Sequence, residues 1–174
     1  YAAIADGGQY RKPVFYTKVT DSKGNVLIDN TENKATQVFK ASTASLLTNA
    51  MEDVLEKGTG VAARLDNMHA AGKTGTTNEA KDLVFAGFTP YYTAAIWATY
   101  DTHAEFPESD REFHKRLWAK VMNEIHEGLA DMDFETSATV QEATICTKTG
   151  LLARSSCPSI TEYFAVSDLP TERC

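Results

Sequence analysis

Two stretches of the chain place apolar residues at the spacing of an amphipathic helix. Residues 41–56 repeat an apolar side chain every third or fourth position, and Lys57-Gly58 ends the run. Residues 110–128 carry a second apolar stripe, formed by Phe113, Leu117, Trp118, Val121, Met122 and Ile125. We predict that both stretches are helices and that the second stripe is ordinary helix core.

The N-terminal part of the chain alternates between turn signals and short β-rich runs. Residues 1–6 are predicted to be the end of a helix, because Gly7-Gly8 follows them. Residues 14–20 and 25–29 flank the turn-forming residues 21–24. We therefore predict a hairpin ahead of the first long helix.

Three further runs between the two helices are predicted to be strands. They cover residues 73–77, 83–89 and 92–99, and short loops join them. The order along the chain is then strand pair, helix, three-strand meander and helix. This order predicts an α+β fold in which helices pack on an antiparallel sheet.

Beyond Gly128 the chain becomes rich in serine and threonine and loses its periodicity, with one plausible strand at residues 140–146. We expect two parts: a main domain over residues 1–130 and a loop-rich, cysteine-containing tail over residues 131–174. No apolar run is long enough to span a membrane, and no signal peptide is visible. Tyr1 is not an initiator methionine, so we expect that the chain begins inside a larger protein.

The composition indicates an ordinary globular protein, with 43% hydrophobic and 24% charged residues. The formal net charge of −7 disfavours nucleic acid or an anionic membrane as the main partner. The four histidines show no H-E-x-x-H spacing and are predicted to be isolated surface residues: His69, His103, His114 and His126.

All three cysteines, Cys146, Cys157 and Cys174, lie in the predicted tail. They show no C-x-x-C spacing and no histidine follows them, which disfavours zinc and redox motifs; we predict neither a metal nor a cofactor. Their clustering in a loop-rich tail favours one disulfide between Cys146 and Cys157, in an oxidising compartment. The alternative, unpaired cysteines, stays open.

The strand at residues 73–77 carries the candidate chemistry. The Lys73 ammonium supplies positive potential for a substrate carboxylate, and the hydroxyls of Thr74 and Thr76 can donate to it or relay a proton. Gly75 lets a ligand lie close to the strand, and a backbone N–H there can serve an oxyanion. Lys73 and Thr76 are the candidate catalytic residues. The candidate substrate-binding residues are Lys73, Thr74, Gly75, Thr76 and Thr77.

Two other patterns compete with this interpretation. A second Lys-Thr-Gly at residues 148–150 is not followed by a strand meander, and we predict that it has no catalytic role. Gly72-Lys73-Thr74 imitates the end of a phosphate-binding loop, but Asn67 stands where that motif needs glycine and strands follow it. A polar edge strand with a solvated Lys73 is the remaining, non-functional alternative.

Around Lys73 the sequence resembles class A penicillin-binding proteins, the bifunctional peptidoglycan synthases. One departure is Val84-Phe85, where that family usually has tryptophan and phenylalanine. The matching segments follow the family's order and cover nearly the whole chain: residues 1–8, 57–60, 63–64, 71–78, 81–82, 85–90, 100–101, 150–153, 157–158, 161–164 and 170–174.

The resemblance implies a partial penicillin-binding/β-lactamase-like transpeptidase fold. It implies a D,D-transpeptidase that joins peptidoglycan stem peptides through an acyl-serine, at the extracytoplasmic face of the bacterial membrane. By position, Lys73, Thr74 and Thr76 would hold the terminal carboxylate of the peptide or of a β-lactam. The N–H of Thr76 would be an oxyanion donor.

The nucleophile motif of that family, Ser-x-x-Lys, does not occur in the chain, and neither does Ser-x-Asn. We therefore expect the serine, the glycosyltransferase domain and the membrane anchor to belong to a longer parent protein, and the chain alone to be inactive. A sheet edge that the missing half would cover predicts pairing with a second copy or a complementing chain. Two alternatives stay open: a non-catalytic penicillin-sensor or wall-binding domain of the same fold, and a β-lactamase.

Overall fold

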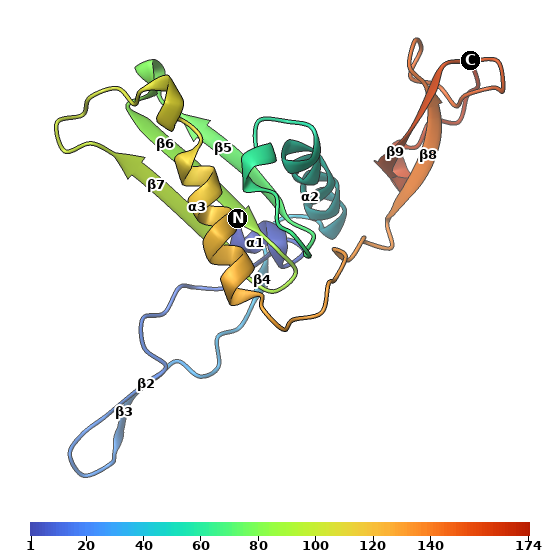
Figure 1. The fold of residues 1–174 in the computed structure, drawn as a ribbon. Coiled ribbons are helices and arrows are strands. Elements are labelled where there is room, and N and C mark those ends of the chain that lie inside the picture. The colour runs from blue at the N-terminus through green and yellow to red at the C-terminus, as the bar shows by residue number, and fades with distance from the viewer.

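The computed structural model describes residues 1–174 and has a three-stranded antiparallel sheet at its centre (Figure 1). Its strands are β5 (Ala71–Thr76), β6 (Asp82–Phe88) and β7 (Thr93–Thr99), in the order β5-β6-β7. The predicted meander is therefore confirmed. Because β6 is hydrogen-bonded on both sides, β5 and β7 form the two edges, and Lys73 lies on an edge strand.

Two helices pack against this sheet. α3 (Phe113–Ile125) crosses one face, and α2 (Ala41–Glu56) lies beside β5 (Figure 1). The bounds of α2 are those predicted from its periodicity. α3 is shorter than predicted, because the 3₁₀ turn η3 (Glu108–Asp110) precedes it and His126 ends it.

Phe85 of β6 lies at the centre of the main core cluster. Its side chain is 0% exposed, and its ring meets the Trp118 ring edge-on at a centroid distance of 4.9 Å. The same cluster contains Leu55 of α2 and Ala63 of the 3₁₀ turn η1 (Val61–Ala63). The sheet and both helices therefore share one core. Its other buried members are Leu65, Met68, Ala119 and Met122.

The predicted stripe of α3 is only half buried. Trp118 and Met122 face the core, but the other four members are at least a third exposed: Phe113, Leu117, Val121 and Ile125. These four are spaced four residues apart and lie along one line of the helix. The prediction that the whole stripe is core was wrong, because the helix meets the sheet along a neighbouring line that includes His114, Lys115 and Ala119.

The N-terminal segment is held against the body by short elements. α1 (Ala2–Ala5) ends before Gly7 and Gly8, as predicted. β1 (Gln9–Tyr10) then pairs with β4 (Thr36–Gln37). Gly8 has a φ of +90° and a Cβ there would lie 2.2 Å from Phe39 O, so glycine is required at this position.

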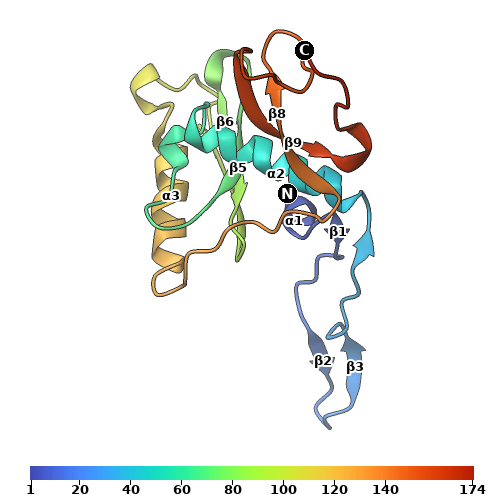
Figure 2. The ribbon, with the colours of Figure 1, turned by 90° about the vertical axis from the view of Figure 1, so that its right-hand side faces the viewer.

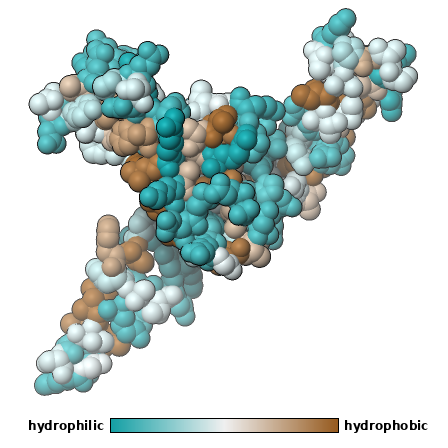
Figure 3. Space-filling view, viewed as in Figure 1, coloured by the Kyte–Doolittle hydropathy of each residue, from teal (hydrophilic) through white to brown (hydrophobic).

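The predicted hairpin is present and projects from the body (Figure 1). It consists of β2 (Lys18–Thr20) and β3 (Val26–Asp29), so its first strand is shorter than predicted. Every residue of β3 is exposed, and Figure 3 shows apolar surface along this arm. Phe15, just ahead of β2, is 99% exposed.

The C-terminal part is more ordered than the predicted loop-rich tail. β8 (Val140–Cys146) pairs with β9 (Ser159–Ala165), and the 3₁₀ turn η4 (Val166–Asp168) follows. Figure 2 shows this hairpin beside α2, which β9 contacts. The second strand was missed because its Ser/Thr-rich approach reads as loop.

The predicted pairing of Cys146 with Cys157 was wrong. The structure joins Cys157 to Cys174 and leaves Cys146 unpaired and buried. The C-terminal segment returns to the hairpin, where the Cys174 N–H donates to Leu152 O at 3.1 Å. The C-terminal segment thereby brings Cys174 next to Cys157. The spacing of the cysteines in the sequence does not indicate this contact.

Replacing Phe85 with alanine is expected to lower the free energy of unfolding by about 3–5 kcal/mol, because it leaves a cavity in the shared core. Phe15→Ala is the matched control: the side chain is 99% exposed, so a change within about 0.5 kcal/mol is expected. Urea unfolding followed by circular dichroism measures both. Equal effects of the two substitutions would contradict this description of the core.

Candidate functional site

The polar motif occupies the open half of edge strand β5. Ala71 and Gly72 are buried, Thr74 is partly buried, and Lys73, Gly75 and Thr76 are exposed. Strand β6 pairs with one side of β5, and no strand pairs with the other. The backbone and side chains of the motif are therefore accessible to a ligand along one edge.

Side chains from both faces of β5 meet at this edge. Thr74 lies opposite Phe85, which packs against Trp118, so Thr74 is on the face covered by α3. Lys73 lies opposite Ala86 and so starts from the other face. The Lys73 Nζ nevertheless donates to Thr74 O at 2.9 Å and to Thr74 Oγ1 at 3.3 Å. A positive charge and a hydroxyl group are thus brought together, as the motif predicts.

The Thr74 hydroxyl is held by a second threonine that the sequence did not single out. Thr59 Oγ1 lies 2.8 Å from Thr74 Oγ1, and either atom can be the donor. Thr59 lies in the turn Gly58-Thr59-Gly60, where a Cβ on Gly60 would come within 3.0 Å of Val54. The turn is thus packed closely against α2, and Thr59 lies beside the motif strand.

A buried lysine anchors that turn to α3. Lys115 is 6% exposed, and its Nζ donates to Thr59 O at 2.9 Å and to Glu112 Oε1 at 2.6 Å. A connected path of polar contacts thus runs from α3 through Thr59 to Thr74. Sequence periodicity could not find Lys115, because a lysine beside an apolar stripe reads as a solvated residue.

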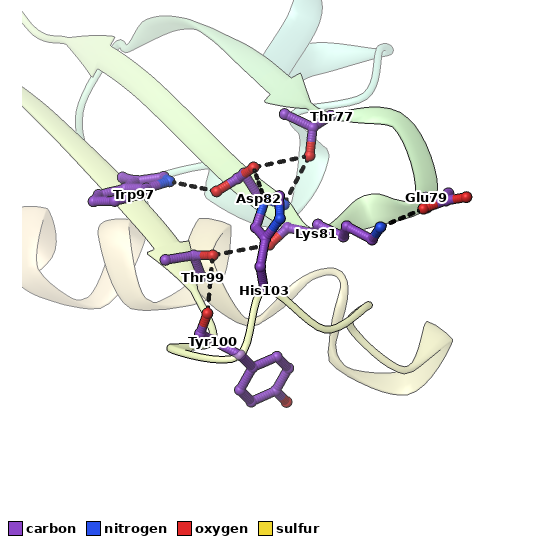
Figure 4. A network of polar contacts seen from close by, with 8 residues as sticks. All are labelled: Thr77, Glu79, Lys81, Asp82, Trp97, Thr99, Tyr100 and His103. Atoms are coloured by element: carbon purple, nitrogen blue, oxygen red, sulfur yellow. Dashed lines mark hydrogen bonds and ion pairs between the residues drawn. The ribbon is translucent and has the colours of Figure 1, made fainter.

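Thr77 is engaged elsewhere, in the network at the β5–β6 turn (Figure 4). Its Oγ1 donates to Asp82 Oδ2 at 3.1 Å and accepts from the Asp82 N–H at 2.8 Å. Trp97 Nε1 donates to Asp82 Oδ1 at 3.1 Å, and His103 Nε2 lies 3.3 Å from Oδ2. These contacts, the Trp97 bond first, hold the pKa of Asp82 below its usual value. The structure thus gives Thr77 a place in the turn rather than at the open edge.

The second Lys-Thr-Gly lies in the C-terminal hairpin and not on a strand. Residues 148–150 form the turn after β8, where Gly150 has a φ of +73° and its N–H donates to Cys146 O at 2.8 Å. No meander follows this turn, which matches the surroundings expected of a non-catalytic copy.

Two of the four histidines are not the surface residues predicted. His69 and His103 are exposed, but His114 and His126 are buried. His126 is satisfied: its ring nitrogens lie 2.6 Å from Met122 O and 2.7 Å from Thr89 Oγ1. His114 has no partner for either ring nitrogen. His114 lies on the core-facing line of α3 and His126 directly follows the helix. The sequence did not reveal this line because the apolar stripe of the helix is wider than its buried part.

Two family models match the chain in succession. The model described as "Penicillin binding protein transpeptidase domain" matches residues 1–127, and "Penicillin-binding protein 1A, C-terminal domain" matches residues 137–174. Because the first model matches well over half of the chain, the chain belongs to the penicillin-binding protein transpeptidase family. The predicted resemblance to class A penicillin-binding proteins is confirmed.

Curated relatives agree with the second match. Penicillin-binding protein 1A of Clostridium perfringens is 31% identical over 100% of the chain, and that of Clostridium tetani is 34% identical over 100%. The chain spans 22% and 23% of the lengths of these two relatives. It therefore corresponds to about a fifth of proteins of this kind.

Solved structures bear out the fold. The crystal structure of penicillin-binding protein 1A from Haemophilus influenzae matches 100% of the chain with a TM-score of 0.82, at 19% identity, and the chain covers 32% of it. PonA1 from Mycobacterium tuberculosis matches 78% of the chain with a TM-score of 0.63, at 27% identity, and 38% of that chain is covered. The predicted fold class, helices packed on an antiparallel sheet in a penicillin-binding transpeptidase fold, is confirmed.

The buried His114 predicts a loss of stability in acid. Burial, and then the charge of Lys115, hold its pKa below the ordinary 6.5, while Glu112 opposes them. Below about pH 6.5 the unfolded chain takes up a proton that the folded chain does not, so the free energy of unfolding falls as pH decreases.

Urea unfolding at pH 7.5 and pH 5.5 checks this, with His114→Leu expected to reduce the loss of stability between the two. His103→Leu is the control, because that side chain is exposed and its removal should leave the contribution of His114 intact. An unchanged loss in His114→Leu would contradict the assignment.

Proposed function

We propose that residues 73–76 form one wall of the acyl-transfer pocket of a serine-type D,D-transpeptidase that cross-links peptidoglycan stem peptides. The observation that carries this proposal is the meeting of the Lys73 ammonium and the Thr74 hydroxyl at the open edge of β5. It occurs in a chain of the penicillin-binding transpeptidase family. The same pocket would bind β-lactams.

The geometry supports a defined role for each residue of the wall. Lys73 and Thr74 bind the terminal carboxylate of a D-Ala-D-Ala stem through a charge and a hydrogen bond, with Thr76 as a further donor. The substrate lies along β5 as an added strand, close to Gly75. The Thr76 N–H donates to the developing oxyanion; loss of such a donor costs about 2.7–4 kcal/mol in other enzymes.

The reaction itself needs a nucleophile. A serine Oγ attacks the penultimate D-Ala carbonyl and expels the terminal D-Ala, and an amine from a neighbouring stem then resolves the acyl-enzyme. No serine of this chain is followed three residues on by lysine. We propose that a preceding half of the transpeptidase domain in a longer polypeptide supplies the serine, and that the chain alone is inactive.

We also propose how the chain is divided and where the parent protein works. Residues 1–130 act as the C-terminal portion of the transpeptidase domain, and residues 131–174 as an appended unit that follows it. None of the helices combines the length and the apolar composition that a membrane-spanning segment requires. We propose that the parent works at the extracytoplasmic face of the cytoplasmic membrane through an anchor outside this chain, with a glycosyltransferase domain elsewhere. Its partners are stem peptides, β-lactams and the preceding half of the domain, or a complementing copy.

The alternatives differ in what they predict for residues outside the motif. A β-lactamase gives no reason for the match of residues 137–174 to the C-terminal domain of penicillin-binding protein 1A. A non-catalytic penicillin-sensor or wall-binding domain is favoured only by the lack of Ser-x-x-Lys. It predicts that the preceding half of the domain also lacks Ser-x-x-Lys, which the upstream coding sequence would show.

Fluorescent penicillin tests the proposed function directly. The chain alone should stay unlabelled, and the longer polypeptide with the preceding half of the domain should be labelled. In that polypeptide, Lys73→Ala should slow acylation about 10–150-fold, the equivalent of a lost charged hydrogen bond of about 1.5–3 kcal/mol. Lys148→Ala, in the second Lys-Thr-Gly, should leave the rate unchanged. Absence of labelling in a folded longer polypeptide would exclude the transpeptidase.

Thr59 gives a second prediction on the same assay. Thr59→Val removes the partner of the Thr74 hydroxyl and should slow acylation about fivefold, as expected for a hydrogen bond of about 1 kcal/mol. Thr59→Ser retains the hydroxyl and should keep most of the rate. Equal rates in the two variants would show that Thr59 does not position Thr74.

A further inference from the structure

The three cysteine sulfurs converge on one point of the C-terminal hairpin. The Sγ atoms of Cys146, Cys157 and Cys174 all lie within 4.8 Å of one another. They come from the end of β8, the loop ahead of β9 and the last residue of the chain. Sequence spacing gave no sign of a metal motif because the fold, and not the local sequence, assembles this group.

Backbone hydrogen bonds hold the three cysteines in place independently of the disulfide. The Cys146 N–H donates to Leu151 O at 2.8 Å, and the Cys174 N–H donates to Leu152 O at 3.1 Å. Cys146 and Cys174 are thus both tied to the same two-residue segment. The Cys157 N–H donates to Arg154 O at 3.0 Å, which closes its own turn. Opening the disulfide would therefore leave the sulfurs facing one another.

Cys146 lies in surroundings suited to a thiolate rather than to an inert buried thiol. It is 3% exposed and takes no part in the disulfide. The turn at residues 148–150 folds back onto it, and the Thr149 and Gly150 N–H groups donate to Cys146 O at 3.3 and 2.8 Å. The Thr149 hydroxyl lies next to the sulfur and would stabilise a metal-bound thiolate.

The hairpin also lacks a hydrophobic core of its own. Val140 and Cys146 are its only buried residues, and the core clusters of the chain include no residue after Phe134. Small units without a core are usually held by disulfides or by a structural metal. The disulfide uses only two of the three sulfurs, so it does not account for the position of Cys146 next to them.

We propose that Cys146, Cys157 and Cys174 form a thiolate site for Zn²⁺ in the reduced chain. A small thiol reductant converts the Cys157–Cys174 disulfide into two thiols and is itself oxidised. Each of the three thiols then gives up its proton to solvent on binding Zn²⁺. Tetrahedral Zn²⁺ with bonds of about 2.3 Å holds its sulfurs about 3.8 Å apart, within the observed spacing. A water molecule takes the fourth position, and the disulfide is the oxidised alternative to the metal site.

The test uses the full chain, purified with a thiol reductant in the presence of Zn²⁺ and then freed of excess metal. Elemental analysis should find about one zinc per chain. Titration with Co²⁺ should give thiolate-to-cobalt charge-transfer absorption. Cys146→Ser should weaken metal binding by more than the ~10–100-fold that loss of a second-shell partner costs, and Thr149→Val by about that amount.

Controls separate a specific site from thiol binding in general. Ser155→Ala, a change in the neighbouring loop, should retain the metal, and circular dichroism checks that Cys146→Ser leaves the sheet and helices folded. Equal zinc content in Cys146→Ser and the unchanged chain would overturn the proposal, as would a fully reduced chain without zinc. These results are independent of penicillin labelling, so either proposal can fail alone.

Discussion

The placement of the Lys73 motif depends on how closely the Phe85 ring lies between β5 and α3. Gly72 directly precedes Lys73, and a Cβ there would lie 2.6 Å from Phe85 Cζ. Gly87, which pairs with Gly72, likewise leaves room for α3, because a Cβ on Gly87 would lie 2.8 Å from Trp118 Cζ2. The glycine ahead of the motif is therefore a packing residue. It lets the ring hold β5 against the core up to the point where the polar side chains begin.

Beyond the apolar core, polar contacts hold the motif strand β5 in place. Lys115 is buried next to the core, and burying an ammonium group is unfavourable unless its donors are satisfied. Here Thr59 O and Glu112 Oε1 accept from it, so the charge is compensated and the turn that carries Thr59 is fixed. The Thr74 hydroxyl then depends on α3 although the two are far apart in sequence. α3 thus takes part in shaping the edge of β5, although the motif lies on a different element.

The sequence was most informative where one local pattern decides the structure. α2 follows its apolar period over residues 41–56, and the meander follows three β-rich runs. α3 was harder, because its apolar stripe is wider than the line of the helix that packs on the core, so periodicity could not tell Trp118 from Leu117. The Thr59–Thr74 contact, the burial of Lys115 and the pairing of Cys157 with Cys174 each join distant segments. No local pattern records such contacts.

The two Lys-Thr-Gly sequences show that identical residues carry different chemistry in different backbone conformations. On the extended strand, residues 73–75 bring an ammonium and a hydroxyl together at the open edge. In the turn at residues 148–150, with Gly150 in a left-handed conformation, the Thr149 and Gly150 N–H groups donate back to Cys146 O. The tripeptide thus exposes polar side chains on a strand edge in one setting and closes a backbone turn in the other. The backbone dihedral angles, and not the identity of the three residues, decide which groups the tripeptide exposes.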